Sequence, residues 1–259
     1  MRVPIKMIGL ATTFFWIFLI AILITAVYSA QYLQFNFGQP QTGTTPDNKL
    51  LLSIPVTIIN NGFYDIDYFN ITTEILDQNG FQITSGSTFI PVVGKGQQVT
   101  ATHNMTVDVN DILQSDENFL FNDTELGINE IGSIRIAGII PVQASTNFSM
   151  PWGAPLYNFA LGQYQYTPIN STHVSVTIPI SFDNHASFDL NGNIRIRMYN
   201  STNGLVGRGR TDIQVMQNSP YSGYVSFIVQ TAGMTESGRF EVYFRTSFFN
   251  YGPIVIPYG

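Results

Sequence analysis

Cysteine is absent from this sequence, and charged side chains are few. Of the 259 residues none is Cys, and 11% are Asp, Glu, Lys or Arg. A chain without cysteine has no disulfide framework, no thiol nucleophile, no Cys-ligated zinc and no iron–sulfur cluster. The net charge of −6 lacks the basic excess with which nucleic-acid-binding proteins meet phosphates. The hydrophobic content of 44% nevertheless argues against a disordered chain.

Motifs of the common catalytic and nucleotide-binding folds are also lacking. Gly94-Lys95 has no glycine five residues upstream and no Ser or Thr after the lysine, which a phosphate-binding loop requires. Neither G-x-S-x-G nor H-E-x-x-H occurs. The sequence therefore predicts a non-enzymatic protein without a cofactor.

One long hydrophobic run is present, at residues 7–30, and Arg2 and Lys6 precede it. As a helix, this run extends about 36 Å, which is enough for a hydrocarbon core of about 30 Å. No further Lys or Arg occurs within the run or directly after it. The positive-inside rule therefore places the amino terminus in the cytoplasm and the rest of the chain outside the cell membrane.

A cleaved signal peptide is the alternative interpretation of this run. Its apolar region is usually about 7–15 residues long, shorter than the run here. A cut after Ala30 places bulky Tyr28 at the −3 position, and a cut after Ser29 places Val27 there. We expect residues 1–31 to form a cytoplasmic end and a retained signal-anchor helix in the lipid bilayer.

The rest of the chain contains an internal duplication. At an offset of 124, residues 34–41 lie over 158–165, and residues 53–66 lie over 177–190. An Asn-Gly turn signal falls at the same place in both halves. The sequence thus predicts two tandem copies of one fold.

Towards the carboxyl ends of the two copies the offset changes to 106. This offset places Gly132 over Gly238 and PWG (151–153) over the terminal PYG (257–259). The first copy would then carry 18 extra residues. We expect a first domain at 32–153 with an acidic insertion at 108–131, and a second domain at 154–259.

Both copies have the alternating pattern of half-buried β-strands. Apolar residues and His103 alternate with polar residues over 99–108, and the same period of two recurs over 194–198 and 240–244. Short strands between Asn-Gly, Ser-Gly and Pro signals are typical of a sandwich. We therefore predict an all-β chain: two tandem antiparallel immunoglobulin-like, seven-stranded β-sandwiches after one transmembrane helix. Ile112, Leu113 and Phe119 in the insertion could face the core from short helical turns.

These motifs resemble a known family. Each copy has an apolar strand that ends in TIINNG (57–62) or SFDNHA (181–186), followed by YDI or FDL, a strand and an Asn-Gly turn. Together they resemble the late embryogenesis abundant group 2 domain, or water-stress-hypersensitivity domain, over nearly everything outside the anchor. The family often has Asn-Pro-Asn where this chain has Asn-Asn-Gly and Asn-His-Ala. The resemblance implies a small seven-stranded sandwich with a short helix, a stress-protective role and no catalytic residues.

Acidic side chains cluster in the predicted insertion. A calcium site is one hypothesis for this segment, because calcium binds several carboxylate and carbonyl oxygens from one loop. Its candidate ligands are Asp108, Asp111, Asp116 and Glu117. The spacing is not that of an EF-hand, and a solvated acidic loop is the favoured interpretation. Alternatively, the loop could meet outward-facing arginines of a neighbouring molecule or another partner, namely Arg195, Arg197, Arg208 and Arg210.

Each histidine has a structural interpretation. The duplication places His103 over Phe227, so a core position is favoured over a metal ligand. His185 lies in a turn beside Asn184, and spacing suggests no partner for His173. We therefore expect no metal site built from histidines.

Six Asn-x-Ser/Thr sequons lie on the side of the anchor that is predicted to be outside. Strand phase and turn signals place several of them on the surface, which favours glycosylation. The candidate asparagines are Asn70, Asn104, Asn122, Asn147, Asn170 and Asn200.

The sequence as a whole predicts a structural or interaction protein of the cell envelope. A glycosylated outer protein without disulfides is more typical of an archaeal surface than of a eukaryotic secreted protein. The expected partners are the bilayer through residues 7–30, and other envelope proteins or glycans, whereas nucleic acid is not expected; self-association stays open. Two other functions stay open, a stress-protective module and an accessory subunit of a membrane transporter or enzyme.

Overall fold

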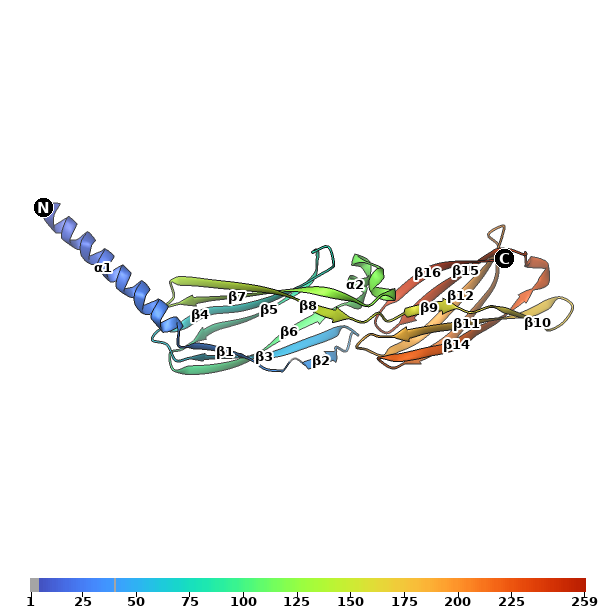
Figure 1. Ribbon diagram of the computed structural model, residues 1–259, viewed down its shortest axis with the longest axis horizontal. Helices are drawn as coiled ribbons and strands as arrows, with labels where there is room; N and C mark the ends of the chain where they lie inside the picture. Colours follow the sequence, from blue (N-terminus) through green and yellow to red (C-terminus); the bar gives the residue numbers. More distant parts are fainter. Residues whose placement is uncertain (1–4, 40) are drawn as a thin grey trace.

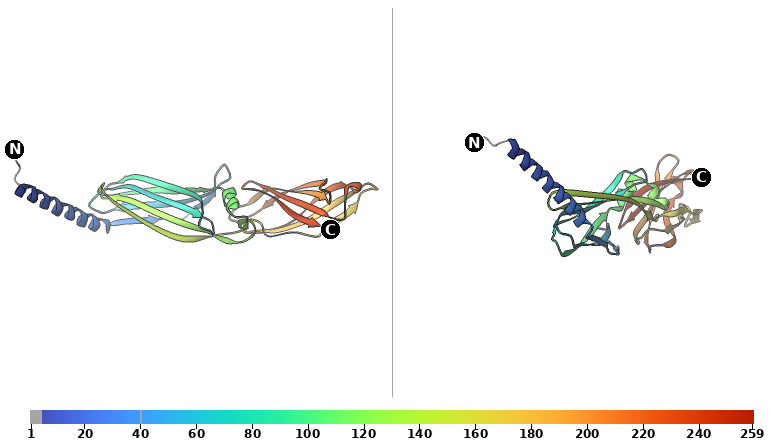
Figure 2. Two further views of the ribbon diagram at one scale, coloured as in Figure 1. Left: turned by 90° about the horizontal axis from the view of Figure 1, so that it is seen from above. Right: turned by 60° about the vertical axis from the view of Figure 1, so that its left-hand side comes forward.

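The computed structural model describes residues 5–39 and 41–259, with side chains from Thr12 onward. A helix, a first β-domain and a second β-domain follow one another in an elongated row (Figures 1 and 2). The helix is α1 (Ile5–Ala30), and Thr12–Ala30 is long and apolar enough to cross a membrane. Arg2 lies outside the described residues, so the orientation of the helix in the membrane stays a prediction.

The first domain consists of two antiparallel sheets. In one sheet the central β3 pairs with β6 on one side and with β1 and β2, one after the other, on the opposite side. The other sheet has the order β5-β4-β7-β8. The strands are β1 (Leu33–Phe37), β2 (Gln41–Thr44), β3 (Leu50–Asn60), β4 (Ile66–Leu76), β5 (Gln82–Val93), β6 (Gln97–Val107), β7 (Thr124–Ile136) and β8 (Ile140–Trp152).

The second domain repeats this topology. Here β11 pairs with β14 and with β9 and β10, and the second sheet has the order β13-β12-β15-β16. The strands are β9 (Tyr157–Leu161), β10 (Gln165–Pro168), β11 (His173–Asn184), β12 (Leu190–Asn200), β13 (Leu205–Val215), β14 (Ser219–Gln230), β15 (Gly238–Thr246) and β16 (Asn250–Tyr258). With each interrupted first strand counted once, both domains are seven-stranded sandwiches. The predicted all-β fold class after one helix is confirmed.

The strand register corrects part of the predicted alignment of the two copies. Ile54 pairs with His103 and Ile178 pairs with Val225, so the counterpart of His103 is Val225. The predicted match with Phe227 was two residues out of register. The conclusion drawn from it holds, because both positions lie on the buried face of β14.

The extra length of the first domain was also overestimated. Leu76 pairs with Gly127, and Asn200, the residue 124 further on, pairs with Gly238. Gly127 rather than Gly132 is therefore the counterpart of Gly238, the offset there is 111, and the PWG and PYG segments are not equivalent. The first domain carries 11 extra residues between β6 and β7, since the offset falls from 122 to 111. Single shared Gly and Pro residues do not fix a register, whereas ladder hydrogen bonds do.

The alternating patterns mark the core as predicted. Ile194, Ile196 and Met198 of β12 are fully buried, as are Val242 and Phe244 of β15. A small buried cluster fills the half of the first domain next to α1. A much larger cluster begins in the other half of the first domain and continues through the second. The apolar core thus runs across the boundary between the domains.

Candidate functional site

The predicted acidic insertion connects the two domains. Its residues 108–123 form α2 (Val109–Ser115) and α3 (Asn118–Phe121), while residues 124–131 belong to β7. Ile112, Leu113 and Phe119 are buried, as their spacing predicted. We call the contact of α2 and α3, residues 152–156 and the turn 185–189 the domain joint.

The four calcium candidates do not converge on one point. Asp108 caps α2 by accepting the Asn110 backbone N–H at 2.9 Å, and Asp116 accepts that of Asn118 at 2.8 Å. Glu117 accepts the hydroxyl of Tyr251 at 2.7 Å. Asp111 is exposed in the first turn of α2. Among the described residues there is no group of three or more His, Asp or Glu that could hold a metal ion.

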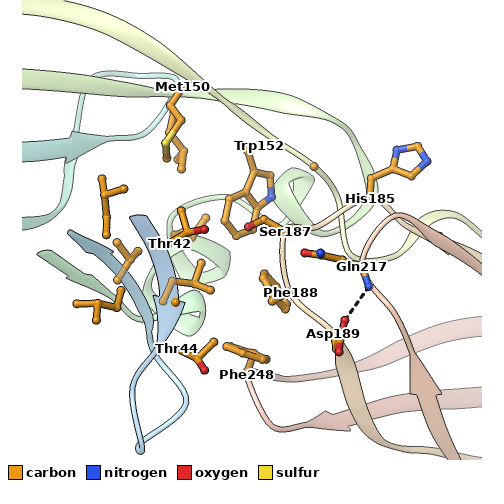
Figure 3. A pocket seen from close by; sticks show the side chains of 18 of the residues that line it. Thr42, Thr44, Met150, Trp152, His185, Ser187, Phe188, Asp189, Gln217 and Phe248 are labelled. Atoms are coloured by element: carbon orange, nitrogen blue, oxygen red, sulfur yellow. Dashed lines mark hydrogen bonds between the residues drawn. The ribbon is translucent and has the colours of Figure 1, made fainter. Parts of the chain in front are cut away.

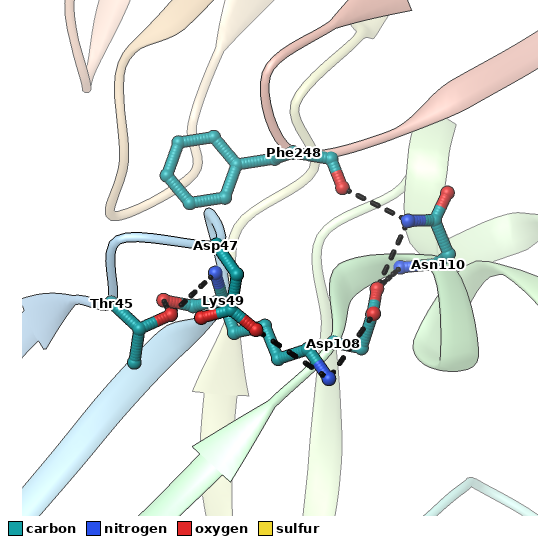
Figure 4. A network of polar contacts seen from close by, with 6 residues as sticks. All are labelled: Thr45, Asp47, Lys49, Asp108, Asn110 and Phe248. Carbon is teal, nitrogen blue, oxygen red and sulfur yellow. Dashed lines mark hydrogen bonds and ion pairs between the residues drawn. The ribbon is translucent and has the colours of Figure 1, made fainter.

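Polar contacts from the insertion reach into the second domain. The Asn110 amide donates to the Phe248 carbonyl oxygen at 3.2 Å, and Lys49 lies 3.8 Å from Asp108 (Figure 4). Asp123, directly after α3, accepts the Ala154 backbone N–H at 2.9 Å and lies 2.7 Å from His185 Nδ1. The acidic residues thus have structural partners in both domains.

Aromatic packing and a close backbone approach complete the domain joint. The Trp152 indole donates to the Phe119 carbonyl oxygen at 2.8 Å, and its ring lies between those of Phe119 and Phe188. A Cβ on Gly153 would lie 1.9 Å from the carbonyl oxygen of His185. Only glycine therefore allows the two backbones to approach this closely.

A cleft of about 1310 Å³ opens beside the domain joint (Figure 3). Thr42 and Thr44 of β2 line one side, and Phe188 and Asp189 line the other. Its volume exceeds the range of about 300–1000 Å³ usual for small-molecule pockets. Asp189 accepts the Gln217 backbone N–H at 2.9 Å and so has a role in the turn.

A second candidate surface is the outer face of the β12–β13 pair, which we call the arginine face. The register places Arg195 directly opposite Arg210, and Arg197 directly opposite Arg208. Such cross-strand neighbours have Cβ atoms about 4.5–5.5 Å apart, and like charges there are destabilising. Solvent and an anionic partner can both relieve that repulsion.

Neighbouring side chains neutralise this face only in part. Arg210 lies 2.7 Å from Asp212, whereas Arg195, Arg197 and Arg208 form no ion pair within the described part of the chain. The guanidinium of Arg197 lies 4.9 Å above the ring of Tyr243.

On the adjacent β15, the carboxylate of Glu241 accepts hydrogen bonds from Arg239 and Tyr243. Burial alone would raise the pKa of Glu241, but hydrogen bonds from Tyr243 and Arg239 outweigh it and hold the pKa below its ordinary value. Glu241 is therefore ionised and lies opposite Arg197. The arginine face remains predominantly cationic and exposed.

The histidines occupy separate structural positions. His103 is buried, and its two ring nitrogens lie 2.8 Å from the hydroxyls of Thr73 and Thr88. Burial lowers the pKa of His103, and the charge of Glu130 opposes this. His185 stacks on Tyr157 in the domain joint.

The sequons differ in accessibility. Asn200 is half-buried, and its amide accepts the Gly204 N–H and donates to the Gly233 carbonyl oxygen, which explains this residue without a glycan. Asn70 is also half-buried. The other four candidates are exposed, namely Asn104, Asn122, Asn147 and Asn170.

Comparisons with known proteins do not identify a family. No family model and no curated protein matches the chain. A transglutaminase of red sea bream is 16% identical with a TM-score of 0.31, over 88% of this chain and 31% of that one. A tetra-tandem repeat from the extending region of a large adhesion protein is 13% identical with a TM-score of 0.25, over 87% and 49%. The chain thus spans less than half of either structure, and these likenesses indicate neither family nor function.

Proposed function

We propose that this protein is a non-enzymatic, membrane-anchored component of the cell envelope that presents a cationic binding face away from the membrane. Helix α1 anchors it, the first domain acts as a rigid spacer, and the second domain binds an acidic envelope protein or an acidic glycan. The outward orientation, glycosylation at the exposed sequons and an archaeal origin belong to the same proposal.

The proposal rests on two cross-strand arginine pairs between β12 and β13, Arg195 with Arg210 and Arg197 with Arg208. An arrangement that costs folding free energy is useful where an anionic partner is bound, because each guanidinium presents up to five N–H donors to carboxylate, sulfate or phosphate oxygens. The cationic sheet lies in the domain farthest from α1 (Figure 1). A partner beyond the membrane surface could therefore reach it.

The shape of the molecule supports a spacer. The domain joint contains hydrogen bonds, a buried tryptophan and a continuous apolar core, so the two domains are held in a fixed relation. A fixed relation keeps the arginine face at a defined height, which a flexible linker would not do.

Capture of partners from native membranes tests the proposal. The full chain with Arg195, Arg197, Arg208 and Arg210 changed to Gln should lose its cross-linked partner, and salt should weaken the wild-type complex. Lys95→Gln is the control, because this exposed cation lies in the first domain, away from the arginine face. An unchanged partner set after the fourfold substitution would overturn the proposal.

The same capture separates the two other functions. A transporter or enzyme subunit that stays bound to the fourfold variant would favour an accessory role. A stress-sensitive deletion strain without any stable partner would favour the stress-protective role that the family resemblance implies. Neither outcome fits the arginine face as the binding surface.

A further inference from the structure

We propose that the end of the first domain next to α1 is a membrane footing, which rests in the headgroup layer and outer edge of the bilayer into which α1 inserts. The footing consists of exposed aromatic and aliphatic side chains at one end of the sandwich, namely Tyr28, Tyr32, Phe63, Tyr68, Phe89, Val92 and Ile139. This inference rests on the anchoring role of α1 in the proposed function and adds a contact between the bilayer and the folded domain.

The helix and the first domain are joined without a flexible linker, in what we call the helix joint. Two residues separate the end of α1 from the start of β1. Ser29 is 1% exposed, and its hydroxyl accepts the Phe63 backbone N–H at 2.7 Å. One turn earlier, the hydroxyls of Thr25 and Tyr64 lie 2.7 Å apart. The direction of α1 therefore fixes how the domain lies on the membrane.

The β7–β8 turn lies beside the helix rather than beyond its end. A hollow of about 430 Å³ is bounded by Ile22 of α1, by Tyr64 and by the turn 137–139. Ile22 precedes the end of the helix at Ala30 by eight residues, which is about 12 Å along the helix axis. The turn is therefore level with a part of α1 that is about 12 Å inside its carboxyl end.

That level falls within the bilayer when α1 spans it. The uncharged run of residues 7–30 is about 36 Å long as a helix, whereas the hydrocarbon core is about 30 Å thick. The excess of about one turn places the end of α1 in the headgroup layer, and the turn 137–139 near the outer hydrocarbon edge. Ile139, at the tip of this turn, is 65% exposed to solvent in the isolated chain.

The chemistry of the footing matches this position. Phe63, Tyr68 and Phe89 are more than half exposed, and aromatic rings of this kind are enriched at membrane–water interfaces. Tyr68 has a φ of 55° at a bulge in β4, a conformation that is unfavourable for a bulky residue. The strained backbone projects its ring outward against Phe89, with the guanidinium of Arg135 4.5 Å above it.

The charges near the footing predict which lipids it requires. Asp65 and Asp67 line the hollow, and Asp65 accepts the Lys95 backbone N–H at 2.8 Å. The cations Lys95 and Arg135 lie beside these two carboxylates, so the local charges nearly cancel and give little attraction to anionic headgroups. Apolar burial therefore drives the contact, and the footing should form on zwitterionic phosphatidylcholine without anionic lipid.

Site-directed spin labelling of the full chain tests the footing. Because the chain has no cysteine, Ile139→Cys gives a single labelling site. Ile169→Cys is the matched control, since Ile169 is an exposed isoleucine (51%) in the turn after β10, in the second domain. Both proteins are reconstituted into phosphatidylcholine vesicles, and collisions of the label with oxygen and with a water-soluble nickel chelate are compared.

We expect a several-fold higher ratio of oxygen to nickel collisions at position 139 than at position 169, because oxygen partitions into the bilayer and the chelate does not. Equal ratios in protein that floats with the vesicles would overturn the footing and leave the anchor intact. Low collision rates with both reagents at position 139 would also overturn it, because they indicate burial against a second copy. Protein that does not float with the vesicles would refute the anchoring role itself.

Discussion

The helix joint and the domain joint lie at opposite ends of the first domain and share one structural element. At the helix joint the buried Asn60 donates to the backbone oxygens of Tyr64 and Val93, at 2.9 Å each. At the domain joint the buried Asn184 donates in the same way to Phe188 and Met216, at 2.9 and 3.1 Å. In each domain this asparagine shapes the loop after β3 or β11, on which the preceding element docks.

The two joints differ in what docks on that loop. At the helix joint the last turn of a single helix is held by a serine hydroxyl, with exposed aromatic rings around it. At the domain joint the preceding domain contributes α2, α3 and Trp152, and the apolar core is continuous. The duplicated fold thus has one docking loop, and the insertion of the first domain adapts it to hold a second domain. The predictions below test how far the two joints are equivalent.

The largest loss of stability is expected from Gly153→Val. The new side chain would collide with the backbone oxygen of His185, which cannot move without opening the joint. Overpacking typically costs about 1–3 kcal/mol, and a clash with backbone lies at the upper end of that range. Gly43→Val is the control, because its Cβ would meet no atom within 4 Å. Calorimetry should show a lowered transition only for Gly153→Val, and limited proteolysis should cut it near the joint. A wild-type melting curve for that variant would contradict a rigid domain joint.

Removal of the shared asparagine should affect both joints to a similar degree. Asn60→Ala and Asn184→Ala each remove side-chain hydrogen bonds to two backbone oxygens and one backbone N–H, which costs about 2–3 kcal/mol in buried surroundings. Asn61→Ala, next in the chain and exposed, should change the free energy of unfolding by less than about 0.5 kcal/mol. Urea denaturation gives the three values. A large change for one buried asparagine only would show that the two loops are not equivalent.

The sequence predicted the outline of this architecture, because hydrophobic periodicity and an internal duplication can both be recognised without knowledge of the contacts in the fold. Alternation placed His103, Ile194 and Ile196 on buried faces, and all three are buried. The role of the insertion was not predicted, because its acidic residues were interpreted without their partners. Asp123 and Glu117 contact residues 62 and 134 positions further along the chain. Contacts of that separation leave no periodic trace, although Ile112 and Phe119 within an acidic segment signalled that it was partly buried.

A smaller loss of stability is expected when a polar contact specific to one joint is removed. Ser29→Ala removes an acceptor that is buried at the helix joint, which costs about 1–2 kcal/mol. Asp123→Asn removes the carboxylate charge that faces His185, between side chains that are 49% and 36% exposed, and exposed pairs contribute about 0–1 kcal/mol. The side-chain oxygen of Asn can still accept the backbone N–H of Ala154, a residue that is fully buried. Thermal denaturation in detergent should therefore rank Ser29→Ala as the more destabilised protein, and the reverse order would show that the domain joint depends on this carboxylate.

The smallest expected effect is a difference between the two domains in how the free energy of unfolding depends on pH. Burial holds the pKa of His103 below the ordinary value of 6.5, so below pH 6.5 the unfolded chain takes up a proton that the folded domain does not. The stabilisation is therefore complete above pH 6.5 and is lost as the pH falls from 6.5 through the folded pKa. Val225, the counterpart in the second domain, cannot titrate. His103→Gln should flatten this slope in urea titrations between pH 7.5 and pH 5, whereas His173→Gln, which changes a histidine in the second domain, should keep it. If both variants retain the wild-type slope, another group in the first domain carries the proton uptake, and the buried imidazole is not what distinguishes the two copies.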